Sequence, residues 1–278
     1  MTTEELIAAR RAEPWREALR KSKKNKERTD IPRVEMNELD AEYRSHTRLE
    51  EVNLGLTKEQ AMQEAQRCLD CPNPTCMQGC PVSINIPTFV KNIERGEFLE
   101  AARVLKETSA LPAVCGRVCP QEKQCESKCI HLKMGKPAVA IGYLERFAAD
   151  YERESGNISI PEVAEKNGIK IAVVGSGPAG LSFAGDMAKR GYDVTVFEAL
   201  HEIGGVLKYG IPEFRLPNKI VDVEIEGLRK MGVKFMTNCI VGKTISYDDL
   251  HADGFKGIFA ASGAGLPNFM NIPGENLV

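Results

Sequence analysis

The chain lacks long hydrophobic runs. None of its apolar stretches approaches the roughly 20 residues that a membrane-spanning helix needs. Its first residues, Met1-Thr-Thr-Glu-Glu-Leu6, run into charge and contain no apolar core of the kind found in secretory signal peptides. We therefore expect a cytoplasmic protein that does not use a membrane as a partner.

The sequence also lacks an excess of charge of one sign. Its 37 Lys and Arg residues and 39 Asp and Glu residues give a formal net charge of -2. This balance does not favour nucleic acid as a partner. Residues 10–28 are the exception, because nine basic side chains there outnumber three acidic ones. A solvated helical arm is the simplest interpretation of this stretch, and docking onto an acidic partner is the alternative.

Histidine is scarce, with four residues in the chain. His131, His201 and His251 lie in no recognisable arrangement with a nucleophile, so we predict no catalytic residues.

Cysteine is abundant by contrast, and eight of the nine cysteines form two groups. The groups have the spacings C-x2-C-x4-C-x3-C and C-x3-C-x5-C-x3-C, at Cys68, Cys71, Cys76 and Cys80, and at Cys115, Cys119, Cys125 and Cys129. Several soft thiolates on a short loop are what an iron-sulfur cluster requires. Disulfides are disfavoured in a reducing cytoplasm, and structural zinc usually uses two C-x2-C pairs, of which only one is present. The ninth, Cys239, is expected to be a small buried hydrophobe near a strand.

The chain divides into three stretches. Residues 1–56 are polar and weakly helical, and we expect an extension that packs on something else. Residues 57–155 carry apolar residues at helical spacing between the cysteine loops, which predicts a small all-helical module. Helices are expected over 86–93, 98–106 and 139–151, with a capping box at Thr57. Residues 152–157 are expected to form a polar linker, and the pattern of residues 156–278 then changes character.

The third stretch predicts a Rossmann-like, doubly wound parallel sheet, so the fold class is α plus α/β. A strand over 169–174 is followed by Gly175-Ser-Gly-Pro-Ala-Gly180, a helix and a strand over 193–197. The glycines allow a tight turn, approach of a pyrophosphate and close packing of helix on strand. Glu198 follows the second strand, where a carboxylate can bind ribose hydroxyls. Both FAD and NAD use this fingerprint.

A further segment resembles a known family. The segment Gly204-Gly-Val-Leu-Lys-Tyr-Gly-Ile-Pro-Glu-Phe-Arg-Leu-Pro217 resembles the flavin-binding segment of the glutamate synthase small (beta) subunit. The sequence Val114-Cys-Gly-Arg-Val-Cys-Pro120 and both cysteine groups are similar to the same family. That family includes the N-terminal part of dihydropyrimidine dehydrogenase and the large subunit of NADH-dependent ferredoxin:NADP oxidoreductase. The resemblance covers roughly residues 35–278 and is specific, because two independent motif sets occur in the same order.

The resemblance implies crossed ligation of two 4Fe-4S clusters. One cluster would be held by Cys68, Cys71, Cys76 and Cys129, and the other by Cys80, Cys119, Cys125 and Glu145. In two-cluster ferredoxins the fourth cysteine of a run likewise serves the other cluster. From the residues alone, Cys115 would be chosen over Glu145, because a thiolate is the softer ligand.

The resemblance also implies FAD in the Rossmann-like domain. The expected contacts are Ser176, Gly177, Pro178, Ala179 and Gly180 along the pyrophosphate, Glu198 on the ribose, and Gly205, Val206, Arg215, Val118 and Val241 near the rest of the cofactor. Plain core packing is an equal alternative for the three valines, and a surface salt bridge for Arg215. The turn over 260–265 is expected to approach the flavin.

The function implied by the resemblance is electron transfer from NAD(P)H through FAD and two clusters to a partner in a hetero-oligomer. A glutamate synthase large subunit is the expected partner. The alternatives are a subunit of an electron-bifurcating ferredoxin:NADP oxidoreductase and a non-catalytic module that holds clusters and docks. No second G-x-G-x-x-G/A occurs in the sequence. We therefore expect a fragment with an incomplete FAD domain, or else a separate chain that supplies the NAD(P)H site.

Overall fold

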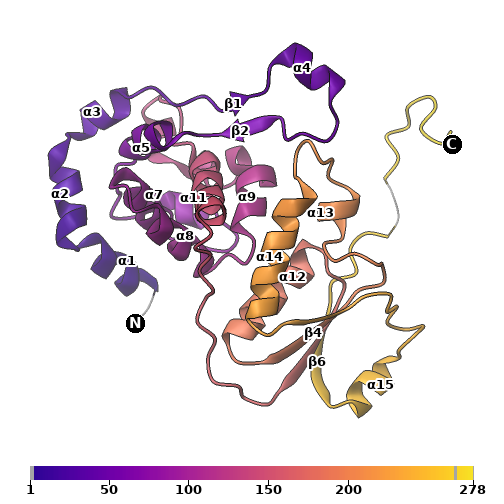
Figure 1. The fold of residues 1–278 in the computed structure, drawn as a ribbon. Coiled ribbons are helices and arrows are strands. Elements are labelled where there is room, and N and C mark those ends of the chain that lie inside the picture. The colour runs from indigo at the N-terminus through magenta and orange to yellow at the C-terminus, as the bar shows by residue number, and fades with distance from the viewer. Residues whose placement is uncertain (1–2, 266–267, 278) are drawn as a thin grey trace.

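The structure is a computed structural model that describes residues 3–265 and 268–277. Figure 1 shows a helical domain beside a domain that contains a sheet, with an N-terminal arm along the outer side of the helical domain. In the described part of the chain, no helix is both long and apolar enough to cross a bilayer.

The helical domain has five main helices and four short helical turns. The main helices are α5 (Lys58–Gln66), α7 (Ile86–Glu94), α8 (Phe98–Lys106), α9 (Pro112–Val118) and α11 (Ile141–Ser155). The short turns in the cysteine loops are α6 (Thr75–Gln78), η1 (Gln121–Lys123), η2 (Glu126–Lys128) and α10 (Ile130–Lys133). The predicted helices over 86–93 and 98–106 are therefore confirmed, whereas the third begins two residues later than predicted and runs on to Ser155.

The predicted capping box is also present. The Thr57 hydroxyl accepts from the Gln60 backbone N–H at 3.2 Å, and the Gln60 side chain accepts from the Thr57 N–H at 2.8 Å. These two bonds satisfy backbone donors that the first turn of α5 would otherwise leave unpaired.

The second domain contains a four-stranded parallel sheet, which confirms the predicted fold class. Its strand order is β5 (Lys234–Met236), β4 (Asp193–Phe197), β3 (Lys170–Val174) and β6 (Phe255–Ala260). Helices α12 (Pro178–Lys189) and α14 (Asn218–Lys230) lie between the sheet and the helical domain (Figure 1). Val173 packs in the core on that side, and Ala172 packs with Leu250 of α15 (Tyr247–Ala252) on the other.

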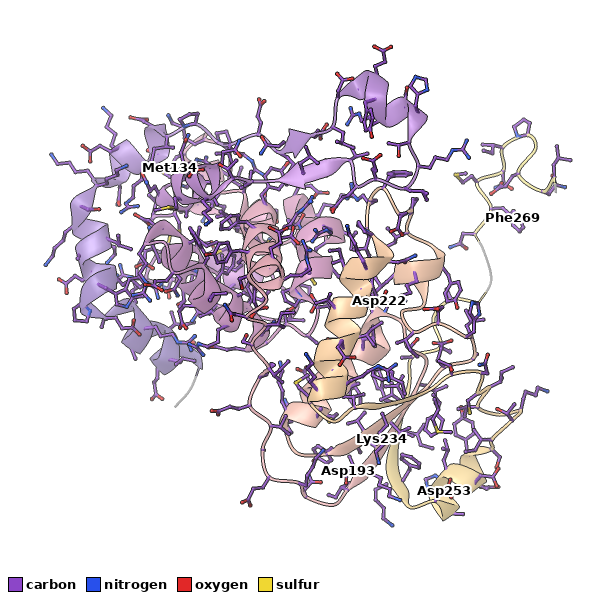
Figure 2. All side chains as sticks on the ribbon, in the orientation of Figure 1. Met134, Asp193, Asp222, Lys234, Asp253 and Phe269 are labelled. Atoms are coloured by element: carbon purple, nitrogen blue, oxygen red, sulfur yellow. The ribbon has the colours of Figure 1, made fainter. Side chains whose placement is uncertain are left out.

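The parallel strands place their carboxyl ends at a single edge of the sheet. Asp193 and Lys234 begin β4 and β5, and Figure 2 shows both at the same edge, far from Met134 in the helical domain. The opposite edge therefore holds the glycine turn after β3, Glu198 after β4 and α13 (Val206–Tyr209). Ligands of open parallel sheets bind at this carboxyl edge.

The N-terminal arm packs on the helical domain. Its helices are α1 (Thr3–Arg11), α2 (Pro14–Ser22) and α3 (Asn25–Asp30), followed by α4 (Ala41–His46) between the antiparallel β1 (Asn37–Glu38) and β2 (Asn53–Gly55). The expectation of a solvated arm is wrong for Arg16 and Arg28, which are each 1% exposed. Arg28 pairs with Glu94 at 2.8 Å. The arm is basic in part because its cations neutralise acidic residues of the same chain.

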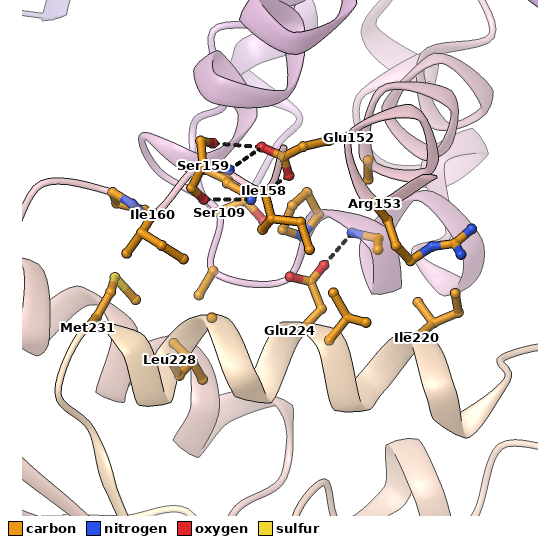
Figure 3. Close-up of a pocket in the computed structure, with 18 of the residues that line it drawn as sticks. Ser109, Glu152, Arg153, Ile158, Ser159, Ile160, Ile220, Glu224, Leu228 and Met231 are labelled. Carbon is orange, nitrogen blue, oxygen red and sulfur yellow. Dashed lines mark hydrogen bonds and ion pairs between the residues drawn. The ribbon is translucent and has the colours of Figure 1, made fainter. Parts of the chain in front are cut away.

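The two domains share a packed seam. Leu111, Val114 and Ala149 of the helical domain belong to the same core cluster as the apolar residues of α12 and α14. Figure 3 shows the seam around Glu224 of α14, whose carboxylate accepts from the Ala113 N–H at 2.7 Å. Helix α9 is therefore held by both domains.

Candidate functional site

Four cysteines from both sequence groups line one cavity in the helical domain. They are Cys68, Cys71, Cys76 and Cys129, and we call this group the first cysteine site. Ile86, Pro87 and Val90 of α7 form an apolar wall of the same cavity, together with His131. These are the four cysteines expected to share a cluster, although their role as ligands stays a prediction.

Three other cysteines gather around Glu145 of α11. Burial, with contributions from the nearby Glu145 and Cys80, raises the pKa of Cys119 to about 11. Burial likewise raises the pKa of Cys125 to about 12, with contributions from Glu126, Glu145 and Cys80. We call Cys80, Cys119, Cys125 and Glu145 the second cysteine site.

Two close contacts explain why the grouping in space differs from the grouping in sequence. The Thr75 hydroxyl donates to the Lys128 carbonyl at 2.6 Å, which brings loops of the two sequence groups together. Gly79 packs so tightly that a Cβ there would lie 2.5 Å from the Gln124 carbonyl oxygen. Only glycine permits this approach, and the approach carries Cys80 toward the loop of the second group.

Burial keeps the Cys68 and Cys76 thiols protonated when nothing is bound. It raises the pKa of Cys68 to about 11 and the pKa of Cys76 well above its ordinary value. Reactive cysteines need a lowered pKa, so these thiols are not suited to nucleophilic catalysis. They are suited to metal, which displaces thiol protons on binding.

One carboxylate oxygen of Glu145 lacks a hydrogen-bond partner within the described residues. Its side chain is buried, and the oxygen without a partner is Oε1. Burial, assisted by the negative charge of Glu224, raises its pKa to about 8. A buried polar atom without a partner costs roughly 1–3 kcal/mol. An iron ion would supply the missing interaction and would favour the ionised carboxylate.

Cys115 lies in the same neighbourhood. Burial raises its pKa well above the ordinary value, and Glu145 and Cys119 are among the negative groups that raise it further. Both candidates for the eighth ligand are therefore close to the second cysteine site, and the choice between them stays a prediction.

In residues 3–265 and 268–277, no three His, Cys, Asp or Glu side chains converge closely enough to hold a single metal ion, and all nine cysteines are free thiols. Structural zinc uses four ligands about 2.0–2.3 Å from a single point, whereas an iron-sulfur cluster spreads its ligands around a cage of four irons.

A separate cavity of about 670 Å³ lies at the carboxyl edge of the sheet. Gly175 has a φ of +100°, and a Cβ there would lie 2.4 Å from the Ala261 carbonyl oxygen, so the turn requires glycine. Gly177 has open space where its Cβ would be, which leaves the backbone accessible. No side chain caps the N-terminus of α12 at Gly177. The first amides of α12 are therefore free to bind an anion such as a pyrophosphate.

Glu198 lines this cavity and holds the glycine turn in place. Its Oε2 accepts from the Ser176 N–H at 2.8 Å and from the Ser176 hydroxyl, and its Oε1 accepts from the Leu200 N–H at 2.9 Å. The Ser176 hydroxyl accepts in turn from the Gly204 N–H at 3.0 Å. Because Oε1 retains a free acceptor position, the carboxylate is preorganised to bind a hydroxyl.

Most predicted nucleotide-binding residues line the cavity, and three do not. Those that do are Ser176, Gly177, Pro178, Ala179, Glu198, Gly205, Val206 and Val241. Gly180 instead packs on the turn, since a Cβ there would lie 2.0 Å from the Gly175 carbonyl oxygen. Val118 packs against the core of the sheet domain, and Arg215 is exposed between α13 and α14.

Sequence reasoning missed several lining residues. Leu200 and Tyr209 line the cavity and are nearly half exposed, as apolar residues around a ligand would be in its absence. Tyr209 lies within the segment that resembles a flavin-binding segment, so that signal could have found it. Cys239 also lines the cavity and is half-buried, which corrects the expectation that it is buried in the core. No sequence pattern marks it.

Comparison with known proteins identifies both domains. Residues 44–157 match the family described as dihydropyrimidine dehydrogenase domain II, 4Fe-4S cluster. Residues 173–231 match the NAD(P)-binding Rossmann-like domain. The chain thus consists of an iron-sulfur domain followed by a Rossmann-like dinucleotide-binding domain.

Three longer proteins are similar to most of this chain. The chain is 39% identical over 224 residues to the NAD-dependent dihydropyrimidine dehydrogenase subunit PreT of Escherichia coli (strain K12), covering 80% of this chain and 54% of the relative. It is 40% identical over 195 residues to the glutamate synthase (NADPH) small chain of the same strain, covering 70% and 41%. For the small chain of Azospirillum brasilense the identity is 33% over 227 residues, covering 82% and 47%.

The chain is homologous over most of its length to iron-sulfur oxidoreductase subunits that include the glutamate synthase small chain and PreT. The predicted resemblance to that family is confirmed. The chain spans about half the length of the curated relatives it matches.

Proposed function

We propose that the chain is an electron-transfer subunit that holds two 4Fe-4S clusters and FAD. The observation that carries the proposal is the regrouping of the cysteines in space. Two sequence groups become a site of four cysteines and a site of three cysteines with a buried, unpaired Glu145 oxygen. Two clusters need eight ligands, and this arrangement offers them as two sets of four.

FAD is proposed for the cavity at the sheet edge, although the matching family model is described as NAD(P)-binding. The two cofactors share the glycine fingerprint, so the fingerprint does not decide between them. The segment 204–217 supports FAD through its resemblance to a flavin-binding segment. Gly205, with a φ of +53°, lies so close to the glycine turn that a Cβ would be 2.9 Å from the Gly177 Cα. The segment thereby extends the cavity beyond the turn, with Val206 and Tyr209 in its wall.

Bound FAD would accept a hydride and release single electrons, and bound clusters would carry them. The protein positions these groups. Helix α9 packs its Val114 in the core of the sheet domain, and Cys119 directly follows the same helix. The second cysteine site is therefore tied to the FAD domain by one rigid element.

NAD(P)H is the proposed donor. Its site is proposed to lie outside this chain, because the sequence holds one glycine signature and the proposed FAD uses it. We place the protein in the cytoplasm, where thiols stay reduced until metal binds.

For the partner we propose a glutamate synthase large subunit in a hetero-oligomer, on the strength of 40% identity to a glutamate synthase small chain. The 39% identity to PreT favours a second candidate, a dihydropyrimidine dehydrogenase partner subunit. The two candidates differ in acceptor and not in the cofactors of this chain.

Anaerobic cofactor analysis tests the proposal. We expect about eight irons, about eight sulfides and one FAD per purified chain. Zinc without iron, or iron without flavin, would contradict it. Titration with NADPH or NADH in the presence of each candidate partner should then bleach the visible spectrum only where the donor site is present. Glutamate formation from glutamine and 2-oxoglutarate would identify the first partner, and dihydropyrimidine formation the second.

A further inference from the structure

The N-terminal arm lies largely outside the residues matched by the iron-sulfur family, yet it contacts the first cysteine site. Three arginines of α1 and α2 converge on Asp70, which directly precedes Cys71. Arg11 Nε donates to the Asp70 carbonyl at 2.9 Å, and Arg20 Nη1 donates to Asp70 Oδ2 at 2.7 Å. Arg16 Nε donates to the same Oδ2 at 3.0 Å, while its Nη2 donates to Oδ1. The arm therefore binds Asp70 of the cysteine loop through these three arginines.

Asp70 is unusual in conformation and in burial. Its φ is +52°, in the left-handed region that few residues other than glycine adopt, and its side chain is fully buried. Aspartate tolerates this conformation better than most residues. A buried carboxylate is expensive unless it is paired. The arginines meet that requirement, so the loop conformation depends on the arm.

Arg16 also reaches the opposite wall of the site. Its Nη1 donates to the Thr88 hydroxyl at 2.8 Å, and Thr88 lies in α7 between Pro87 and Val90, which line the cavity. Lys91 of the same helix donates to the Cys68 carbonyl at 2.6 Å. Arg16 and Lys91 are thus buried cations that join α7 to the cysteine loop.

We propose that Arg16 is a positioning residue of the first cysteine site, and that the arm is a functional part of that site. By bracing the Cys68–Cys71 loop against α7, Arg16 fixes the separation of the ligands and brings positive charge close to them. The inference rests on the proposed cluster in this site. Cluster potential depends on nearby net charge, so Arg16 should raise the reduction potential and Asp70 should lower it.

Substitutions of this pair test the inference on the anaerobically purified holoprotein. Arg16→Gln should lower the reduction potential of one cluster and speed the loss of its iron in air. Asp70→Asn suits the same backbone conformation and should shift that potential upward. Lys21→Gln is the matched control, because Lys21 is on the same helix with its side chain 76% exposed, and it should change nothing. Each cluster is followed by electron paramagnetic resonance during a redox titration.

The outcomes separate positioning from general stability. If Arg16→Gln matches the wild type in potential and iron retention, the inference is wrong. It is equally wrong if Arg16→Gln and Asp70→Asn shift the potential in the same direction, or if both clusters and the flavin are lost together. Should Arg16→Gln fail to fold, Arg16→Lys keeps the charge without the forked geometry. That variant should keep the potential and lose iron faster, and wild-type behaviour would overturn the inference.

The wild-type protein serves as the reference for the proposed function. A wild-type chain without iron would remove the proposed clusters altogether. If the wild type holds its full iron and Arg16→Gln has the same reduction potential and iron retention, only the role of the arm is contradicted.

Discussion

The two cysteine sites offer similar ligands in different electrostatic surroundings. Around the first site, Lys91 donates to the Cys68 carbonyl, and Arg16 and Arg20 pair with Asp70. Around the second, carboxylates outside the proposed ligand set, such as Glu126 beside Cys125, add to burial in raising the pKa of the thiols. Groups around a metal centre tune its potential as the ligands do. The comparison teaches that one small domain can place similar thiols in two sites with opposite neighbouring charge.

The largest expected effect is the loss of the cluster proposed for the second site alone. Glu145→Ala should remove one cluster, so that iron falls from about eight to about four per chain while FAD stays bound. The physical reason is that the carboxylate is the proposed fourth donor of that site. Iron analysis and electron paramagnetic resonance of the purified variant measure the loss.

Two further variants identify the eighth ligand. Cys115→Ser should retain about eight irons, because the proposed ligand set leaves its thiol unused. Glu122→Ala controls for loss of a carboxylate near Cys119, and it should also be without effect. The reverse pattern, with iron lost from Cys115→Ser and kept in Glu145→Ala, would reassign the ligand.

A smaller effect, a shift in reduction potential, tests the difference in neighbouring charge between the two sites. Lys91→Met removes a fully buried cation beside the first site and should lower the potential of that cluster alone. One unit charge at about 8 Å and an effective dielectric of about 20 corresponds to about 2 kcal/mol. Because Glu94 pairs with Lys91 and offsets part of this, we expect a shift on the order of 50 mV for a one-electron couple.

Glu94→Gln is the matched partner variant, and it should raise the same potential. Redox titration of both variants tests the sign. An unchanged first cluster in both, or a shift of the second cluster instead, would mean that the charge difference between the sites has no redox consequence.

Local patterns explain what could be predicted from the sequence. The glycine turn, β3, β4 and the helices α7 and α8 each depend on residues close together in the chain, so their periodicity and turn chemistry were sufficient. The docking of the arm was not predictable, because Arg16 and Asp70 are 54 positions apart. Composition alone does not distinguish a buried, paired arginine from a solvated one. Arg215 shows the converse, since a cation suited to phosphate lies away from the cavity.

The smallest expected effect concerns pH at the seam that holds the second site. Burial raises the pKa of Glu224 to about 7, although the Ala113 N–H and Lys106 act against it. Since this pKa exceeds the ordinary 4.5, the protonated carboxyl stabilises the fold below pH 4.5, and this contribution is lost as pH rises through about 7. Glu224→Gln keeps an oxygen for the Ala113 N–H without titrating. Its advantage over the wild type in free energy of unfolding should therefore grow from pH 5 to pH 8, by about 1–3 kcal/mol.

Thermal midpoints of both proteins across this pH range measure the difference, and the exposed Glu226→Gln on the same helix is the control. Parallel curves for the wild type and Glu224→Gln would show that the seam does not titrate. If the curves diverge, the two sites can be compared again, because α9 joins Glu224 to the second site and not to the first. The signal of the second cluster should then change with pH more than that of the first. Equal changes would mean that the helical domain responds as one unit, and that the difference between the two sites is confined to their immediate charges.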